Sequence, residues 1–147
     1  MKIGIDSSVI IAGVHANHPR HAAASHWLVQ SLSAHELVVC HHSVLESYAI
    51  LTSLPGDLRV TPSEARDLLE ATVKANMVVA GFQPESIWST LGSFVPMTAV
   101  GGRSCDAFVA CVLHAYGTRA VATFNPKHFA GLIEGFQVID PGEAGAA

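Results

Sequence analysis

The segment IGIDSSVIIA (residues 3–12) decides the fold class. Ile3 and Ile5 alternate with other residues as in a short strand, and Asp6 follows directly. The apolar run over residues 9–12 then comes at the density of a helix. This order predicts a strand, an acidic turn and the start of a helix, with Asp6 at the carboxyl end of the strand.

Strands and helices alternate through the rest of the chain. Apolar residues spaced by three and four predict an amphipathic helix over residues 21–34, followed by a strand over residues 37–40. The run TPSE (residues 61–64) predicts a capped helix that continues to about residue 76. The other predicted elements are a helix that begins at Pro84, a buried helix over residues 105–116 that stops at Gly117, and strands over residues 78–82, 120–123 and 137–139. Alternation of this kind predicts an α/β fold around a mainly parallel sheet.

Length and composition limit the organisation and the possible partners. A chain of 147 residues can bury a proper core, and we expect one domain over residues 1–141 and a short loose tail over residues 142–147. Half of the residues are apolar and 14% are charged, which favours a compact globule. The net charge is -4, so any contact with nucleic acid must depend on local groups of Lys and Arg.

Cysteine usage and hydropathy also indicate the cellular compartment. Its three cysteines form no CxxC pair, and their odd number favours a reducing environment. We find no leader pattern and no run of about 18 uninterrupted apolar residues. These features predict a soluble cytoplasmic protein without membrane contact. The positive mean hydropathy favours a large buried fraction or a buried oligomer interface.

Four polar residues fall where a parallel sheet gathers its ligands. Asp6, Glu46 and Asn125 follow predicted strands, whose carboxyl ends meet at one edge of a sheet. Asp106 lies in the first turn of the buried helix, where the macrodipole favours an acid. Carboxylates gathered there would raise one another's pKa unless a cation neutralised them, and such hard oxygen ligands suit Mg²⁺ or Mn²⁺. A metal at this position could activate a water for phosphodiester hydrolysis.

Each of the three acids also has a purely structural interpretation. Glu46 could accept a hydrogen bond from the amide of Ser43, since SVLE has the spacing of a capping box. Asp106 could be a first-turn charge two positions after a Ser104 cap. Asp6 could be an ordinary turn or helix-cap residue. Taken singly, the three acids leave both interpretations open.

In their order and context these motifs resemble the PIN domain, and within it the VapC-type toxins of bacterial toxin-antitoxin pairs. Residues 5–10 (IDSSVI) look like the opening motif of that family, and residues 43–46 (SVLE) are similar to the second. Residues 102–110 (GRSCDAFVA) look like the third and most specific motif. Residues 122–129 (ATFNPKHF) resemble the closing motif, and the resemblance spans residues 3–141.

The resemblance implies a three-layer α/β/α domain with a short central sheet. It also implies a type II toxin that acts as a metal-dependent endoribonuclease with Mg²⁺ or Mn²⁺, forms a homodimer and is inhibited by a cognate antitoxin. It assigns Asp6, Glu46 and Asp106 to the metal and adds Asn125 to the catalytic residues. Asn125 departs from the family's pattern, which has an acid there. Asparagine can orient a water but adds no charge, so the number of metals, one or two, stays open.

Neighbouring polar residues extend the predicted site. Ser7, Ser8 and Thr123 could bond to the acids and fix their rotamers, although hydroxyl groups near strand ends more often cap locally. Arg103 and Lys127 lie beside the predicted acids in the sequence and are the expected contacts for RNA phosphates.

Histidines are frequent near the amino end of the chain. The spacing of His15, His18 and His21 could indicate a transition-metal face, but no acid or cysteine lies beside them, which favours a solvated or loop cluster. We predict that His41 and His42 form a turn.

Two other functions compete with the nuclease hypothesis. A metal phosphatase could use Asp6 as a nucleophile, but position 8 is Ser rather than a second acid, and no phosphate-binding or dinucleotide motif is present. A catalytically weak binding or regulatory module of the same fold stays open because Asn125 is neutral. For a regulating antitoxin, an acidic pocket can accept an arginine of the partner, and an apolar groove between helices can accept an amphipathic segment.

Overall fold

A parallel sheet of five strands forms the centre of the chain, in the order β3-β2-β1-β4-β5. The computed structural model describes residues 1–144. Its strands are β1 (Lys2–Ile5), β2 (Glu36–Cys40), β3 (Val78–Ala80), β4 (Ala120–Ala122) and β5 (Gln137–Ile139). Every neighbouring pair of these strands is parallel, which confirms the predicted sheet.

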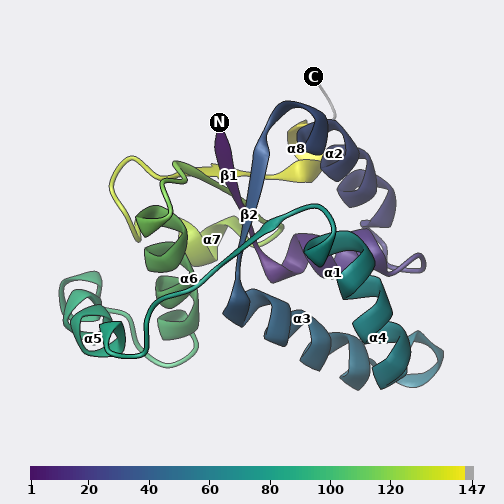
Figure 1. Cartoon of the computed structure of the whole chain (residues 1–147), viewed down its shortest axis with the longest axis horizontal. Coiled ribbons are helices and arrows are strands. Elements are labelled where there is room, and N and C mark those ends of the chain that lie inside the picture. The colour runs from purple at the N-terminus through teal and green to yellow at the C-terminus, as the bar shows by residue number, and fades with distance from the viewer. Residues whose placement is uncertain (145–147) are drawn as a thin grey trace.

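Helices connect the strands and cover both faces of the sheet. In chain order they are α1 (Ser7–Val14), α2 (His21–Ala34), α3 (His41–Ser53), η1 (Gly56–Leu58), α4 (Pro62–Leu69), the π-helical turn η2 (Glu70–Lys74), α5 (Ser86–Met97), α6 (Arg103–Ala115), α7 (Pro126–Phe129) and α8 (Pro141–Ala144). Figure 1 shows α1, α2, α3 and α4 on one side of the central strands β1 and β2, and α5 and α6 on the other.

Two apolar cores lie on opposite faces of the sheet because side chains alternate along each strand. Ile3 and Ile5 of β1 belong to the core that is shared with α1 to α4. Gly4, between them, faces α6, which passes so close that a Cβ atom at this position would lie 2.5 Å from a methyl carbon of Leu113. Helices thus pack on both faces, and the three-layer α/β/α architecture is confirmed.

Local sequence signals placed several elements correctly. Helix α2 spans the residues that its apolar spacing predicts. The predicted capping box forms at the start of α4: the amide of Glu64 donates to the Thr61 hydroxyl at 3.3 Å, and the Glu64 carboxylate accepts from the Thr61 amide at 3.0 Å. The predicted continuation of this helix is a π-helical turn from Glu70 onward.

Two helices begin before their predicted starts, and α5 begins at Ser86, two residues after the predicted Pro84. Strand β2 leads directly into α3, which begins at His41, so Ser43 lies inside the helix and the two histidines do not form a separate turn. Helix α6 begins at Arg103 after Gly102, so Ser104 lies in its first turn and does not cap it. In both places a serine carries the local signature of a cap, but the helix begins before the serine, so the serine cannot cap it.

The last described element, α8, begins with the buried Pro141 and contacts α2. Residues 142–144, which we expected to belong to a loose tail, are helical but exposed. The rest of the predicted tail, residues 145–147, lies outside the described residues. No helix within residues 1–144 is long and apolar enough to cross a membrane.

Candidate active site in an acidic pocket

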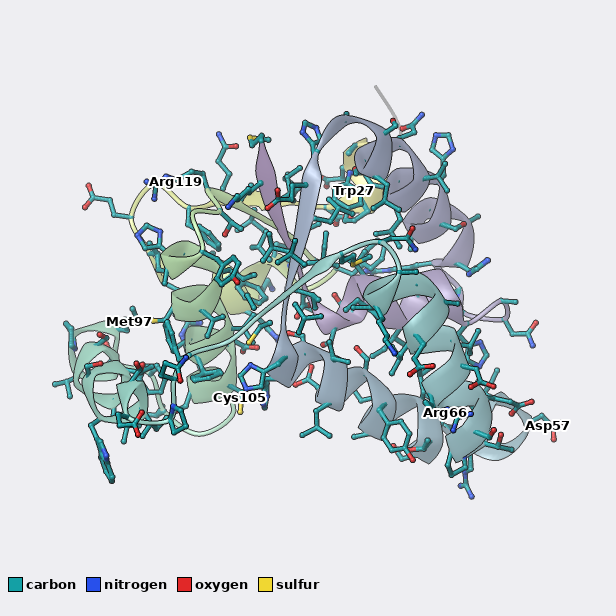
Figure 2. The ribbon with its side chains drawn as sticks, viewed as in Figure 1. Trp27, Asp57, Arg66, Met97, Cys105 and Arg119 are labelled. Carbon is teal, nitrogen blue, oxygen red and sulfur yellow. The ribbon has the colours of Figure 1, made fainter. Side chains whose placement is uncertain are left out.

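An open pocket of about 870 Å³ lies beyond the carboxyl ends of β1 and β4. Asp6 follows β1, Asn125 follows β4 by three positions, Glu46 comes from α3 and Asp106 from the first turn of α6. All four line the pocket, together with Cys105, which Figure 2 labels where α6 begins. The structure therefore brings together the four residues that the sequence proposes as catalytic.

Several hydrogen bonds hold one oxygen of the Asp6 carboxylate. Its Oδ2 accepts from the Ser8 hydroxyl at 2.7 Å and from the Thr123 hydroxyl at 2.8 Å. The same oxygen caps α1 by accepting from the Ser8 amide at 3.4 Å. Asp6 is thus a helix cap as well as a pocket residue, so its structural interpretation holds, and its metal-binding role stays a prediction.

The Ser8 and Thr123 hydroxyl groups, which donate to Asp6, also bind the loop that carries Asn125. The amide of Phe124 donates to the Ser8 hydroxyl at 3.0 Å, and the amide of Asn125 donates to the Thr123 hydroxyl at 2.9 Å. Each hydroxyl therefore accepts from the loop and donates to Asp6. This network fixes the loop after β4 relative to the acid after β1.

The other two acids each face a histidine. The Ser7 hydroxyl donates to Glu46, and His42 Nε2 lies 3.8 Å from the same carboxylate. His128 Nδ1 lies 3.6 Å from Asp106 Oδ2. Sequence reasoning missed both histidines. The spacing of four between His42 and Glu46 on one helix was an available signal, whereas His128 comes from a distant element without a local pattern.

The structure tests the helix-cap interpretation of each acid. Glu46 cannot form the expected capping box, because Ser43 lies inside α3 rather than at its cap. Asp106 remains a first-turn acid of α6, but it follows no serine cap. The cap explanation therefore holds for Asp6 alone.

Burial raises the pKa of Asp106 above the ordinary value of 3.8. His128 opposes this effect, and the negative charges of Asp6 and Glu46 add to it. The three carboxylates therefore share one electrostatic environment.

We expect the Asp106→Asn variant to be more stable than the wild type at neutral pH in the absence of divalent metal. A raised pKa means that the folded protein binds this proton more tightly than the unfolded chain. Stability therefore falls as pH rises from the ordinary value of 3.8 through the raised pKa. Melting temperatures in chelator should show a gain at neutral pH that shrinks at mildly acidic pH. An equal gain at both pH values, or the same gain in the exposed control Asp57→Asn, would contradict this explanation.

The pocket has the donor chemistry of a site for Mg²⁺ or Mn²⁺. Asp6, Glu46, Asp106 and Asn125 offer the hard oxygen atoms that these ions prefer. Within residues 1–144, however, no three His, Cys, Asp or Glu side chains stand close enough together to hold an ion. Metal binding would therefore require the pocket side chains to move closer together.

The expected phosphate contacts differ in position. Arg103 lines the pocket and donates to the carbonyl oxygens of Lys127 at 3.4 Å and Ala130 at 3.3 Å. Lys127 is exposed on α7 and does not line the pocket. Arg20, which the sequence did not suggest, does line it. It lies between α1 and α2, where no motif pointed to the acids.

The chain matches known proteins over most of its length. The family model described as PIN domain covers residues 3–132. Ribonuclease VapC27 of Mycobacterium tuberculosis is 32% identical over 108 residues, which make up 74% of this chain and 74% of that protein.

Two solved structures have a similar fold. The first is VapC20 of Mycobacterium tuberculosis, a toxin that cleaves the sarcin-ricin loop, with a TM-score of 0.69 at 16% identity, covering 90% of this chain and 97% of that one. The second is FitAcB from Neisseria gonorrhoeae, with a TM-score of 0.61 at 15% identity, covering 95% of this chain and 97% of that one. At these identities the two structures bear on the fold alone.

Proposed function

Because the chain belongs to the PIN-domain family, we propose that it is a metal-dependent endoribonuclease and the toxin of a type II toxin-antitoxin system. One observation carries this proposal: Asp6, Glu46 and Asp106 come from three separate elements and line a single pocket. One relative supports it, since it is named as a ribonuclease, and a protein of similar fold is named as a toxin that cleaves the sarcin-ricin loop. In this proposal residues 1–141 form the nuclease domain, which acts in the cytoplasm.

Asp6, Glu46 and Asp106 would hold Mg²⁺ or Mn²⁺, and Asn125 would orient a water beside them. When bound, such an ion lowers the pKa of a water molecule and offsets the charge that builds on the phosphodiester. The carboxylates supply the negative charge that attracts the ion. The pKa of Asp106 is raised first by burial and then by the charges of Asp6 and Glu46, whose repulsion the ion would relieve.

The hydroxyl groups around the acids position them. Ser8 and Thr123 both donate to one oxygen of Asp6, which fixes the rotation of this carboxylate. The Ser7 hydroxyl donates to Glu46 and lies 3.5 Å from Asp6 Oδ1, so it links the two acids. We assign these three hydroxyl residues a positioning role, and not a catalytic one.

Arg103 is proposed to contact an RNA phosphate, because it lines the pocket and its guanidinium group can bind phosphate oxygens in a fork. Lys127 keeps a proposed role as a more peripheral phosphate contact, since it is exposed directly beside the pocket residue His128. Neither cation pairs with an acid within the described part of the chain.

The proposal includes a cognate antitoxin and a homodimer. A second groove of about 840 Å³, with apolar walls that include Leu45 and Leu69, lies between α3 and α4 and could take an amphipathic segment of the antitoxin. Apolar side chains on α5 support self-association: Trp88 is 75% exposed and Val95 is 79% exposed.

The test is incubation of the purified protein with total bacterial RNA in Mg²⁺, in Mn²⁺ and in chelator. We expect discrete fragments with at least one of the metals and none with chelator, because the acids alone cannot activate water at neutral pH. Adding excess metal back to the chelated sample should restore cleavage. Fragmentation that persists in chelator would contradict the metal-dependent mechanism.

A second candidate function is a binding or regulatory module with the same fold. The neutral Asn125 favours it, because an amide adds no charge that attracts a metal. The histidine contacts favour it too, because they face the carboxylate oxygens of Glu46 and Asp106. RNA that stays intact with both metals would favour this function over the nuclease.

A further inference from the structure

Of the Lys and Arg residues in the described part of the chain, two arginines line the acidic pocket. The chain has eight Lys and Arg residues, all within the described part, and of these Arg20 and Arg103 line the pocket. Arg66 and Arg119 lie at other extremes of the molecule, well away from the pocket residue Cys105 (Figure 2). With a net charge of -4, the protein offers no overall attraction to RNA, so local cations must supply the phosphate contacts.

Arg20 is held against the loop after β4. Its Cζ lies 4.8 Å from the centre of the Phe124 ring, and its Nη1 donates to the Phe124 carbonyl at 3.1 Å. This contact uses one of the five guanidinium N–H donors. Among residues 1–144 no carboxylate pairs with Arg20, so its charge and its other donors are available to a ligand.

Arg103 holds the short helix α7, which follows this loop. Arg20 binds the carbonyl of Phe124 in the loop, and Arg103 binds those of Lys127 within α7 and Ala130 directly after it. Asp106 lies three positions after Arg103 on α6, in the same pocket. The pocket therefore carries acids together with two guanidinium groups, one fixed at the loop after β4 and the other at α7.

We propose that Arg20 is a positioning residue for RNA, which binds a backbone phosphate while Arg103 binds another across the acidic pocket. This inference rests on the proposed ribonuclease function and adds a contact that no motif assigns. A guanidinium group fits because its planar fork binds two phosphate oxygens, and because its stacking on Phe124 holds it in place at low entropic cost. The RNA strand would then cross the pocket with its scissile phosphate near the acids.

The alternative is that Arg20 only fastens the loop that carries Asn125. The variant Arg20→Met separates the two roles, because methionine can still pack on the Phe124 ring but carries neither charge nor donors. Arg20→Gln is a second neutral variant, in case the first fails to fold, and Arg20→Lys keeps the charge. The matched control is Arg119→Met, which removes one charge far from the pocket.

The experiment measures anisotropy of a fluorescent single-stranded RNA of mixed sequence in Mg²⁺ at several salt concentrations. The parent protein carries Asp6→Asn and Asp106→Asn to prevent cleavage. We expect either neutral Arg20 variant to weaken binding about tenfold and to lower the slope of log affinity against log salt by about 0.7, the value for one lost phosphate contact on a single strand. Arg20→Lys should keep most of the slope, and the Arg119 variant should match the parent.

The possible outcomes distinguish a failure of this inference from a failure of the proposed ribonuclease function. A parent that binds RNA, with an unchanged affinity and slope in both neutral Arg20 variants, would overturn the inference and leave the ribonuclease intact. A weaker affinity with an unchanged slope would show that Arg20 only fastens the loop, which also overturns it. If the parent binds no RNA and the wild type cleaves none, the proposed function fails together with the inference.

Discussion

Replacing Asp6 and Asp106 together with Asn is expected to lower the rate of RNA cleavage by about 10³-fold or more. Asparagine keeps the shape of each side chain but removes two of the three negative charges that face the pocket. The amide oxygen that Asp6→Asn introduces can still accept from Ser8 or Thr123, so the loop after β4 should keep its place. The loss should therefore appear in the cleavage rate with saturating Mg²⁺ or Mn²⁺, without unfolding in a thermal melt.

The matched control removes the same charge elsewhere. Asp57 and Glu134 are exposed and do not line the pocket, so the double variant Asp57→Asn, Glu134→Gln should cleave RNA like the wild type. A control that loses as much activity as the pocket variant would assign the effect to net charge. Full activity in the Asp6 and Asp106 variant would exclude these acids from the chemistry.

The sequence was sufficient for the elements whose signals are local. Apolar spacing placed α2, and the Thr61 to Glu64 capping box placed the start of α4, because both patterns depend on residues within one or two turns. The caps expected at Ser43 and Ser104 were wrong for the opposite reason. Their signature was present, but the preceding chain enters the helix earlier, which only the packed structure determines.

The residues of the candidate site also differ in whether the sequence could place them. Asp6 and Asn125 could be placed because residues that follow parallel strands meet at one edge of a sheet. Arg20 could not, because its contact with Phe124 joins residues 104 positions apart across two loops. Its role depends on how those loops pack, and no periodicity or motif encodes that packing.

The central claim is that the three carboxylates bind a divalent metal. We expect the substitutions Asp6→Asn and Asp106→Asn together to weaken this binding strongly. Removing a group that merely supports a metal ligand weakens metal binding by about 10- to 100-fold, so removing two ligands should weaken it by at least about 100-fold. The expected affinity comes from relieving the repulsion between acids that now contact His42 and His128. Mg²⁺ should compete with Mn²⁺ for the same site, because both prefer oxygen ligands.

The most direct measurement is therefore a Mn²⁺ titration of the purified protein, followed by the electron paramagnetic resonance signal of free Mn²⁺. Wild type and the Asp57→Asn, Glu134→Gln control should bind Mn²⁺ with equal affinity, and the Asp6→Asn, Asp106→Asn variant should lose this binding. Equal Mn²⁺ binding by the wild type and the pocket variant, or none by the wild type, would contradict a metal site at these acids.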